Sequence, residues 1–193
     1  MVPFALAGII FAADVNPPAS VGGATPEGNW ASACQPIGKG GRHGLVTRIT
    51  IYGDRVEAHA QIYATNHCQT PTFYLTYSGR VTSRQGRDGR IELDQTVRSI
   101  TLTLQAADVV SQYNLEGDHG CGLKGWQLNV GKSVAGKRCD PFSFPTEGTP
   151  LYDTVWIDGD GLRFGAFPMM WTNISVDKRP TQPLPTIYRR VAH

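Results

Sequence analysis

Residues 44–63, GLVTRITIYGDRVEAHAQIY, decide the fold class of this chain. Apolar and polar side chains alternate along both halves of the stretch, and Gly53-Asp54 separates the halves. Successive side chains of a β-strand point to opposite faces, so the alternation places the apolar side chains of each half together. Two such strands joined by a glycine-containing turn are typical of an antiparallel hairpin. The expected buried face consists of Leu45, Thr47, Ile49 and Ile51 in the first strand and Val56, Ala58, Ala60 and Ile62 in the second.

The same alternation recurs along the rest of the chain. A second hairpin is expected over residues 151–167, with its turn at 158–161 (DGDG), because Asp-Gly tolerates the positive φ of tight hairpins. Residues 106–114 form the helical candidate, since their apolar side chains recur at helical spacing. The other expected strands are residues 30–34, 73–82, 96–104, 126–130 and 187–191.

These strands follow one another through short connections, which predicts an all-β fold of about eight or nine antiparallel strands. Closing such an up-and-down meander leaves no unpaired edge, and an eight-stranded interior is filled by side chains or holds one small ligand. We therefore expect one closed barrel with one short helix, and a β-sandwich is the alternative. The barrel domain is assigned to residues 28–193, after an apolar segment at 1–13 and a proline- and glycine-rich linker at 14–27.

The four cysteines indicate the compartment. None lies in a C-x-x-C pair, which argues against a zinc ribbon or a thioredoxin-like motif. Cys34 and Cys68 bracket the first hairpin, and Cys121 and Cys139 bracket a later loop-rich stretch, so we predict the pairs 34–68 and 121–139, although four cysteines allow three connectivities. Disulfides predict an extracytoplasmic protein, whether periplasmic, at the cell surface or secreted; four reduced cysteines in a cytosolic protein are the alternative.

Charge and the N-terminal segment limit the possible partners. A net charge of +2 with scattered Lys and Arg gives no reason to expect nucleic acid. Residues 1–13 are almost wholly apolar, long enough for the core of a signal peptide and too short to span a bilayer. The segment is either removed as a signal or kept as an anchor or packing arm, and a membrane is expected as a partner only if it is kept.

Two resemblances add to this interpretation. Gly28-x-Trp30 entering the first strand, the meander and an arginine near the C-terminus resemble the calycin or lipocalin-like barrels. The resemblance implies that Trp30 plugs the closed end of the barrel and that Arg189 or Arg190 stacks on its indole as a cation–π pair. The chain also resembles small exported bacterial four-cysteine proteins of uncharacterised function, through Tyr152-Asp153, Ile157-Asp158-Gly159, Leu162, Phe164-Gly165 and Lys178-Arg179-Pro180-Thr181.

The functional expectation is binding rather than catalysis. The sequence has no G-x-S-x-G motif and no metal-ligand pattern, so we predict neither an enzyme, nor a metal site, nor a cofactor. Aromatic side chains in the expected strands predict a cavity for a small apolar or aromatic ligand, unless these rings simply fill the barrel. The residues predicted to line that cavity are Tyr63, Tyr77, Trp126 and Trp156.

A second apolar stretch supports the alternative function. Phe167, Met169, Met170 and Trp171 lie in a proline-bearing connection, where they either fold over a barrel mouth or form an exposed patch for a partner. Together with residues 1–13, an exposed patch would indicate a structural or interaction module that binds a protein partner in a cell-surface or extracellular assembly.

Overall fold

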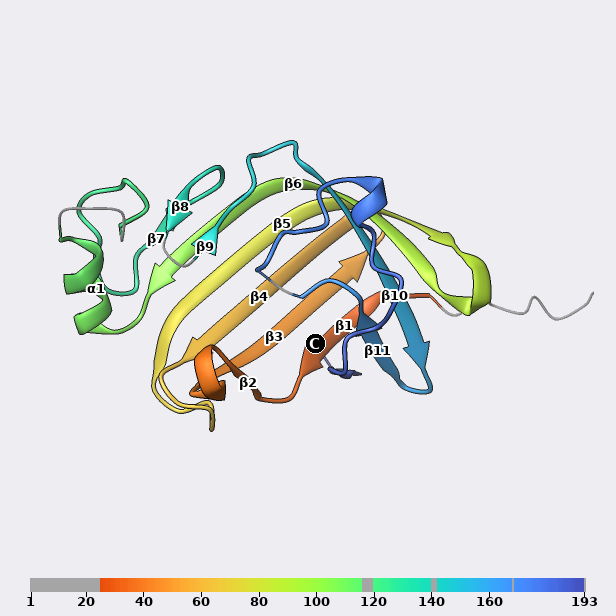
Figure 1. Ribbon diagram of the computed structural model, residues 1–193, viewed down its shortest axis with the longest axis horizontal. Coiled ribbons are helices and arrows are strands. Elements are labelled where there is room, and N and C mark those ends of the chain that lie inside the picture. Colours follow the sequence, from red (N-terminus) through yellow and green to blue (C-terminus); the bar gives the residue numbers. More distant parts are fainter. Residues whose placement is uncertain (1–24, 116–119, 140–141, 168, 193) are drawn as a thin grey trace, which may run out of the picture.

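The computed structural model describes residues 25–115, 120–139, 142–167 and 169–192 (Figure 1). Residues 1–13 and most of the expected linker lie outside these ranges. Within them, eight strands form a closed ring in which every neighbouring pair is antiparallel. The ring follows the chain order: β1 (Gly28–Ser32), β3 (His43–Tyr52), β4 (Arg55–Tyr63), β5 (Pro71–Gln85), β6 (Ile91–Leu104), β10 (Pro150–Asp158), β11 (Gly161–Phe164) and β12 (Tyr188–Arg190), which pairs with β1.

The predicted up-and-down barrel is therefore confirmed, and so is its central hairpin. β3 and β4 pair from Gly44 opposite Tyr63 to Tyr52 opposite Arg55. Seven of the eight side chains expected on the inner face are buried and Ala58 is half-buried. Gly53 adopts a φ of 56° in the connecting turn, a conformation that glycine reaches without steric cost.

A bulge in β6 changes which of its residues point inward. Ile91, Leu93 and Val97 are buried in the first half of the strand, and Ile100, Leu102 and Leu104 in the second half. The register against β5 shifts at Ser78/Gly79, where one extra residue of β6 is accommodated. The buried side chains thus fall at odd-numbered positions before the bulge and at even-numbered positions after it.

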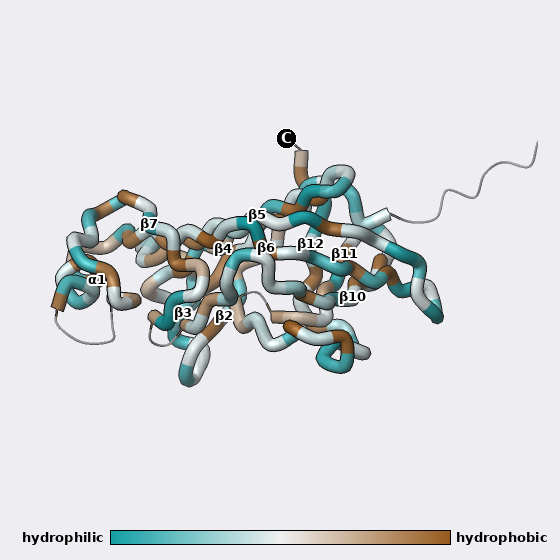
Figure 2. Tube along the Cα trace, turned by 90° about the horizontal axis from the view of Figure 1, so that it is seen from above, coloured by the Kyte–Doolittle hydropathy of each residue, from teal (hydrophilic) through white to brown (hydrophobic). Residues whose placement is uncertain are grey.

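The remaining elements lie outside the ring. β2 (Gln35–Ile37) pairs with β3, β7 (Gly131–Ser133) pairs with β6, and β8 (Arg138–Cys139) pairs with β9 (Phe142–Ser143). The 3₁₀ turns are η1 (Lys39–Gly41), η2 (Arg87–Gly89) and η4 (Val176–Lys178). Helix α1 (Ala107–Tyr113) matches the helical candidate. In both views it lies near one end of the long axis, and β10 and β11 lie toward the other end (Figures 1 and 2).

The strand expected at residues 126–130 is not formed. The side-chain amide of Asn114 binds both the N–H and the carbonyl of Trp126, at 2.8 and 2.9 Å, in place of a neighbouring strand. The Trp126 indole packs edge-on against Tyr113 of α1, with ring centroids 5.5 Å apart. This aromatic contact belongs to a cluster beside the barrel that holds α1 in place.

Both predicted disulfides are formed. Cys34–Cys68 joins the segment before β2 to the loop after β4, and Cys121–Cys139 joins the loop after α1 to β8. Gly44 leaves room for the first bridge, since a Cβ at this position would lie 2.7 Å from the Cys68 Sγ. The bridges tie the loops outside the ring to the barrel and restrict the unfolded chain.

Trp30 and Arg190 form the expected cation–π pair. Trp30 is 2% exposed, and the Arg190 guanidinium lies 4.4 Å from the centroid of its ring. Arg190 also donates a hydrogen bond to the Glu27 carbonyl, and a Cβ at Gly28 would lie 2.2 Å from its Nη1. Arg189 points elsewhere and pairs with the exposed Asp160. The Gly-x-Trp motif thus provides both a buried indole and the space for the arginine that covers it.

The two adjacent arginines give a matched test of this pair. We expect Arg190→Ala to lower the free energy of unfolding by about 1 kcal/mol, because it uncovers the Trp30 indole. Arg189→Ala removes only a surface ion pair and should change the free energy by less than about 0.5 kcal/mol. Urea unfolding with intact disulfides measures both, and equal losses in the two variants would contradict the assignment.

Candidate functional site

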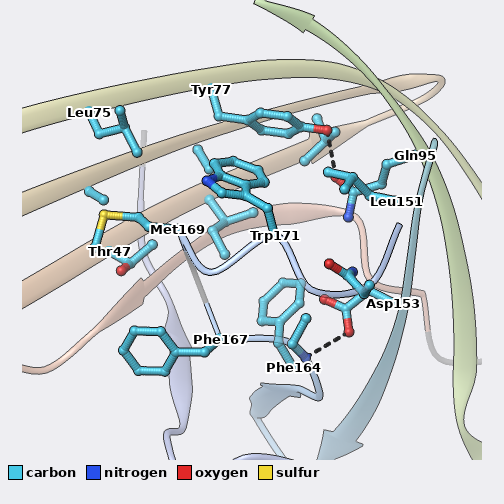
Figure 3. A pocket seen from close by; sticks show the side chains of 16 residues that line it. Thr47, Leu75, Tyr77, Gln95, Leu151, Asp153, Phe164, Phe167, Met169 and Trp171 are labelled. Carbon is cyan, nitrogen blue, oxygen red and sulfur yellow. Dashed lines mark hydrogen bonds between the residues drawn. The ribbon is translucent and has the colours of Figure 1, made fainter. Parts of the chain in front are cut away.

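A cavity of about 90 Å³ lies inside the barrel (Figure 3). Its wall is mostly apolar, with a few polar groups from the strands and from the connection after β11. Such a lining is typical of small-molecule sites. The lining residues are Thr47, Ile49, Val56, Ala58, Ala60, Leu75, Tyr77, Gln95, Leu151, Asp153, Phe164, Ala166, Phe167, Met169, Trp171 and Asn173.

Two alanines of β4 leave the space between the larger side chains. Ala58 lies opposite Ile49 of β3 and Tyr77 of β5 in the strand register, and Ala60 lies one inward position further along. A methyl group at each of these positions reaches less far into the barrel than the Ile, Val or Leu side chains around it. The void is therefore a direct result of the residues that the first hairpin places on its inner face.

Tyr77 gives the cavity a polar group on an aromatic wall. Its hydroxyl donates a 3.0 Å hydrogen bond to the Oε1 of Gln95 from β6. Burial raises the pKa of the Tyr77 hydroxyl, which keeps it neutral. Gly79 makes room for this hydroxyl, since a Cβ there would lie 2.4 Å from the oxygen.

The mouth segment, defined as residue 167 together with residues 169–173, covers the cavity. Phe167, Met169, Trp171 and Asn173 contribute to the lining, whereas Met170 is 60% exposed. Asn173 attaches the segment to β10: its side-chain amide donates to the Tyr152 carbonyl at 3.0 Å, and the Tyr152 N–H donates to the Asn173 carbonyl at 2.8 Å. The segment follows β11 and in Figure 1 crosses in front of the barrel strands.

Trp171 is the largest side chain that the mouth segment inserts. Its ring centroid lies 5.4 Å from that of Tyr77, with the two planes tilted by 44°. Its Nε1 is buried and has no hydrogen-bond acceptor among the described residues. A buried N–H without a partner is costly, so it raises the free energy of the closed arrangement of the mouth segment.

Asp153 is the acidic group of the cavity. It is 5% exposed, and its Oδ1 accepts hydrogen bonds from the N–H groups of Thr154 at 2.7 Å and Ala166 at 2.9 Å. Figure 3 shows the carboxyl group below Trp171, with the bond to Ala166 dashed. Burial raises the pKa of Asp153 to about 7, and the backbone hydrogen bonds and the charge of Arg179 offset only part of this effect.

Arg179 holds the connection after the mouth segment against β10 and β6. Its guanidinium donates to the Asp153 carbonyl at 2.6 Å, pairs with Asp94, and lies 5.3 Å from the Tyr152 ring centroid. Pro180 packs against Gly165, where a Cβ would lie 2.3 Å from the proline Cβ. Residues 152–153, 164–165 and 178–181, which carry the second resemblance, therefore include side chains that meet around Asp153.

Of the four residues predicted to line a ligand cavity, Tyr77 does so. Trp156 lies on the opposite face of β10 from Leu151 and Asp153, and Tyr63 follows the inward-facing Ile62 at the end of β4. Trp126 is buried beside α1 and does not line the cavity. The cavity residues that we missed include Asp153, Gln95 and Asn173. The sequence does contain a signal for Asp153: an acidic residue on the same strand face as Leu151 and Val155, which alternation places inside the barrel.

Three of the four residues predicted to form a partner surface turn inward instead. Phe167, Met169 and Trp171 line the cavity, and Met170 remains exposed. The stretch thus adopts the first of its two expected arrangements, folding over the barrel mouth. The other expected contact surface, residues 1–13, lies outside the described residues.

No protein-family model matches the chain, and no curated protein matches it. The described residues contain no group of three or more His, Cys, Asp or Glu side chains arranged to hold a metal ion. The site therefore has to be interpreted from its own chemistry: a small, mostly apolar cavity with a neutral phenol, a buried carboxyl group and an unused indole N–H.

The raised pKa of Asp153 predicts a pH-dependent stability. Between about pH 4 and pH 7 the folded protein holds a proton that the unfolded chain, with an ordinary Asp pKa of 3.8, has released. Stability due to this group is therefore lost as the pH rises through that window, by up to about 1.4 kcal/mol per pH unit.

Asp153→Asn isolates the effect, because its side-chain oxygen still accepts from Thr154 and Ala166 but cannot titrate. The free energy of unfolding of the wild type, minus that of the variant, should fall as the pH rises from 4 to 7. Urea unfolding at a series of pH values measures this difference. A difference that does not change with pH would show that Asp153 is ionised throughout.

Proposed function

We propose that the chain is a non-enzymatic binding protein that holds a small apolar molecule in its barrel. The observation that supports the proposal most directly is the mostly apolar cavity inside a closed eight-stranded ring, lined by the rings of Tyr77, Phe164 and Trp171. Apolar walls provide affinity by removing the ligand from water, and a few polar groups orient it. The closed barrel with its Trp30–Arg190 pair agrees with the lipocalin-like resemblance.

The size of the cavity limits the ligand. A volume of about 90 Å³ holds several water molecules and is well below the roughly 300 Å³ at which drug-sized sites begin. A ligand of a few carbon atoms fits with little change. A larger one requires Met169 and Trp171 to move, because these side chains occupy the mouth.

We propose binding rather than catalysis because of the bonds that the cysteines and Asp153, the potentially reactive groups, already make. All four cysteines are in disulfides, which leaves no thiol nucleophile. The Oδ1 of Asp153 is bound to two backbone N–H groups, and none of the described residues that line the cavity is a histidine that could share a proton with it. These features support a site that holds a molecule without transforming it.

Two disulfides in a small chain are typical of an oxidising, extracytoplasmic environment. We propose that the protein acts there, as an exported carrier. No helix in the described part of the chain has the length and apolar character needed to cross a bilayer. An interaction module remains the alternative hypothesis, and in the mouth segment it retains the exposed Met170.

A matched pair of alanine substitutions tests the cavity. Ala58→Leu fills the void from the inner face of β4, and we expect it to weaken the binding of neutral apolar probes such as toluene and butanol by roughly tenfold or more. Ala31→Leu adds the same atoms to β1 at a position paired with Arg48 and Arg189, and should leave binding unchanged.

Saturation-transfer NMR detects the probes, and Trp fluorescence gives their affinities. Urea unfolding checks that both variants remain folded. If no probe binds the wild type, or if both variants bind as well as it does, the cavity is not the binding site.

A further inference from the structure

The surroundings of Asp153 disfavour the charged form of an unpaired carboxyl group. It is 5% exposed in a mostly apolar cavity, and no cation lies within ion-pair distance of its carboxyl oxygens among the described residues. Arg179 donates to the backbone carbonyl of Asp153, and its guanidinium forms ion pairs with Asp94 and Glu92 instead. Buried charges are normally paired, so the carboxyl lacks a partner that a ligand could supply.

The other charged and titratable groups around Asp153 do not supply that partner. Tyr77 lines the same cavity, and burial raises its pKa. Burial also raises the pKa of Tyr188 on β12 to about 12, so both phenols are neutral at physiological pH. Arg179 acts from the outer side of β10, through the backbone. On the cavity side, Asp153 thus faces neutral groups only.

The aromatic walls favour the same kind of ligand. The rings of Tyr77 and Trp171 lie 5.4 Å apart at the cavity wall, and Figure 3 shows both above the Asp153 carboxyl. Tyr and Trp rings provide a large apolar contact area for the body of a ligand, and charge-assisted hydrogen bonds to a carboxylate are stronger than neutral ones. A ligand with one ammonium group and a short apolar body would satisfy both the acid and the walls.

We infer that the ligand of this cavity is a small apolar amine, whose ammonium group donates hydrogen bonds to the Asp153 carboxylate while its hydrocarbon part packs against Tyr77 and Trp171. This inference rests on the proposed binding function and specifies the class of ligand. Below about pH 7, where the carboxyl is protonated in the empty protein, binding of the ammonium form also releases up to one proton to solvent.

The test compares molecules of one shape and different charge on the disulfide-intact protein. Butylamine, butanol and butyrate are titrated by calorimetry at pH 6 in two buffers of different ionisation enthalpy. Butylamine should bind about tenfold or more tighter than butanol, and butyrate should not bind. Butylamine binding should release a proton and butanol binding should not. This comparison needs no variant.

Two substitutions then test whether the Asp153 carboxyl group is the partner of the ammonium group. Asp153→Asn should remove the preference for butylamine over butanol, so that the ratio of the two affinities falls to about one. Glu57→Gln makes the same chemical change at an exposed position of β4, and should keep the preference. If butanol binds and butylamine binds no more tightly, the amine assignment is wrong and the binding function stands. If neither these molecules nor toluene binds, the binding function itself is wrong.

Discussion

The closure of the ring by β1 is the constraint on which the rest of the structure depends. β1 is only five residues long, yet it pairs with β12 on one side and with β3 on the other. Trp30 lies opposite both Arg190 and Ile49. It therefore takes part in both strand pairings that close the ring, and its side chain is buried there. Closure gives every strand an inside and an outside, and period-two alternation then assigns each side chain to one of them.

Asp153 combines a structural role at an inward position of β10 with the binding role that we propose for it. The Asp153 Oδ1 joins the start of the post-β11 turn to β10 through the N–H of Ala166. The Arg179 guanidinium and the Pro180 carbonyl attach the following connection to the same strand, through the Asp153 carbonyl and the Thr154 hydroxyl. These contacts hold the carboxyl in the cavity although its burial is unfavourable, which is the arrangement expected where a charged group serves a bound molecule.

The mouth segment is the part of the cavity wall with the least regular backbone. Met169 and Trp171 adopt φ values of 70° and 48°, which side chains of this size rarely do. The Trp171 Nε1 is also buried without an acceptor among the described residues. Both features raise the free energy of the closed arrangement, and both lie at the position where a ligand larger than the cavity would have to enter.

The sequence by itself determined the all-β class, the meander order, the hairpin register and the disulfide pairs. These depend on alternation and on turn chemistry, which are local, and on cysteines that bracket a single structural unit. The Gly-x-Trp motif also indicated the Trp30 plug, although only the structure distinguishes Arg190 from Arg189 as its partner.

The tertiary structure alone decided the site. Trp126 and Trp156 are aromatic residues of expected strands, as Tyr77 is, yet only Tyr77 lines the cavity. The backbone of Trp126 bonds to the Asn114 side chain and not to a neighbouring strand, and Trp156 lies on the outer face of β10. The cavity exists because Ala58 and Ala60 meet Tyr77, Asp153 and Trp171 across the barrel. Most of these residues lie far apart in the sequence, and no local pattern encodes their meeting, because it depends on how the closed ring brings distant strands and one connection together.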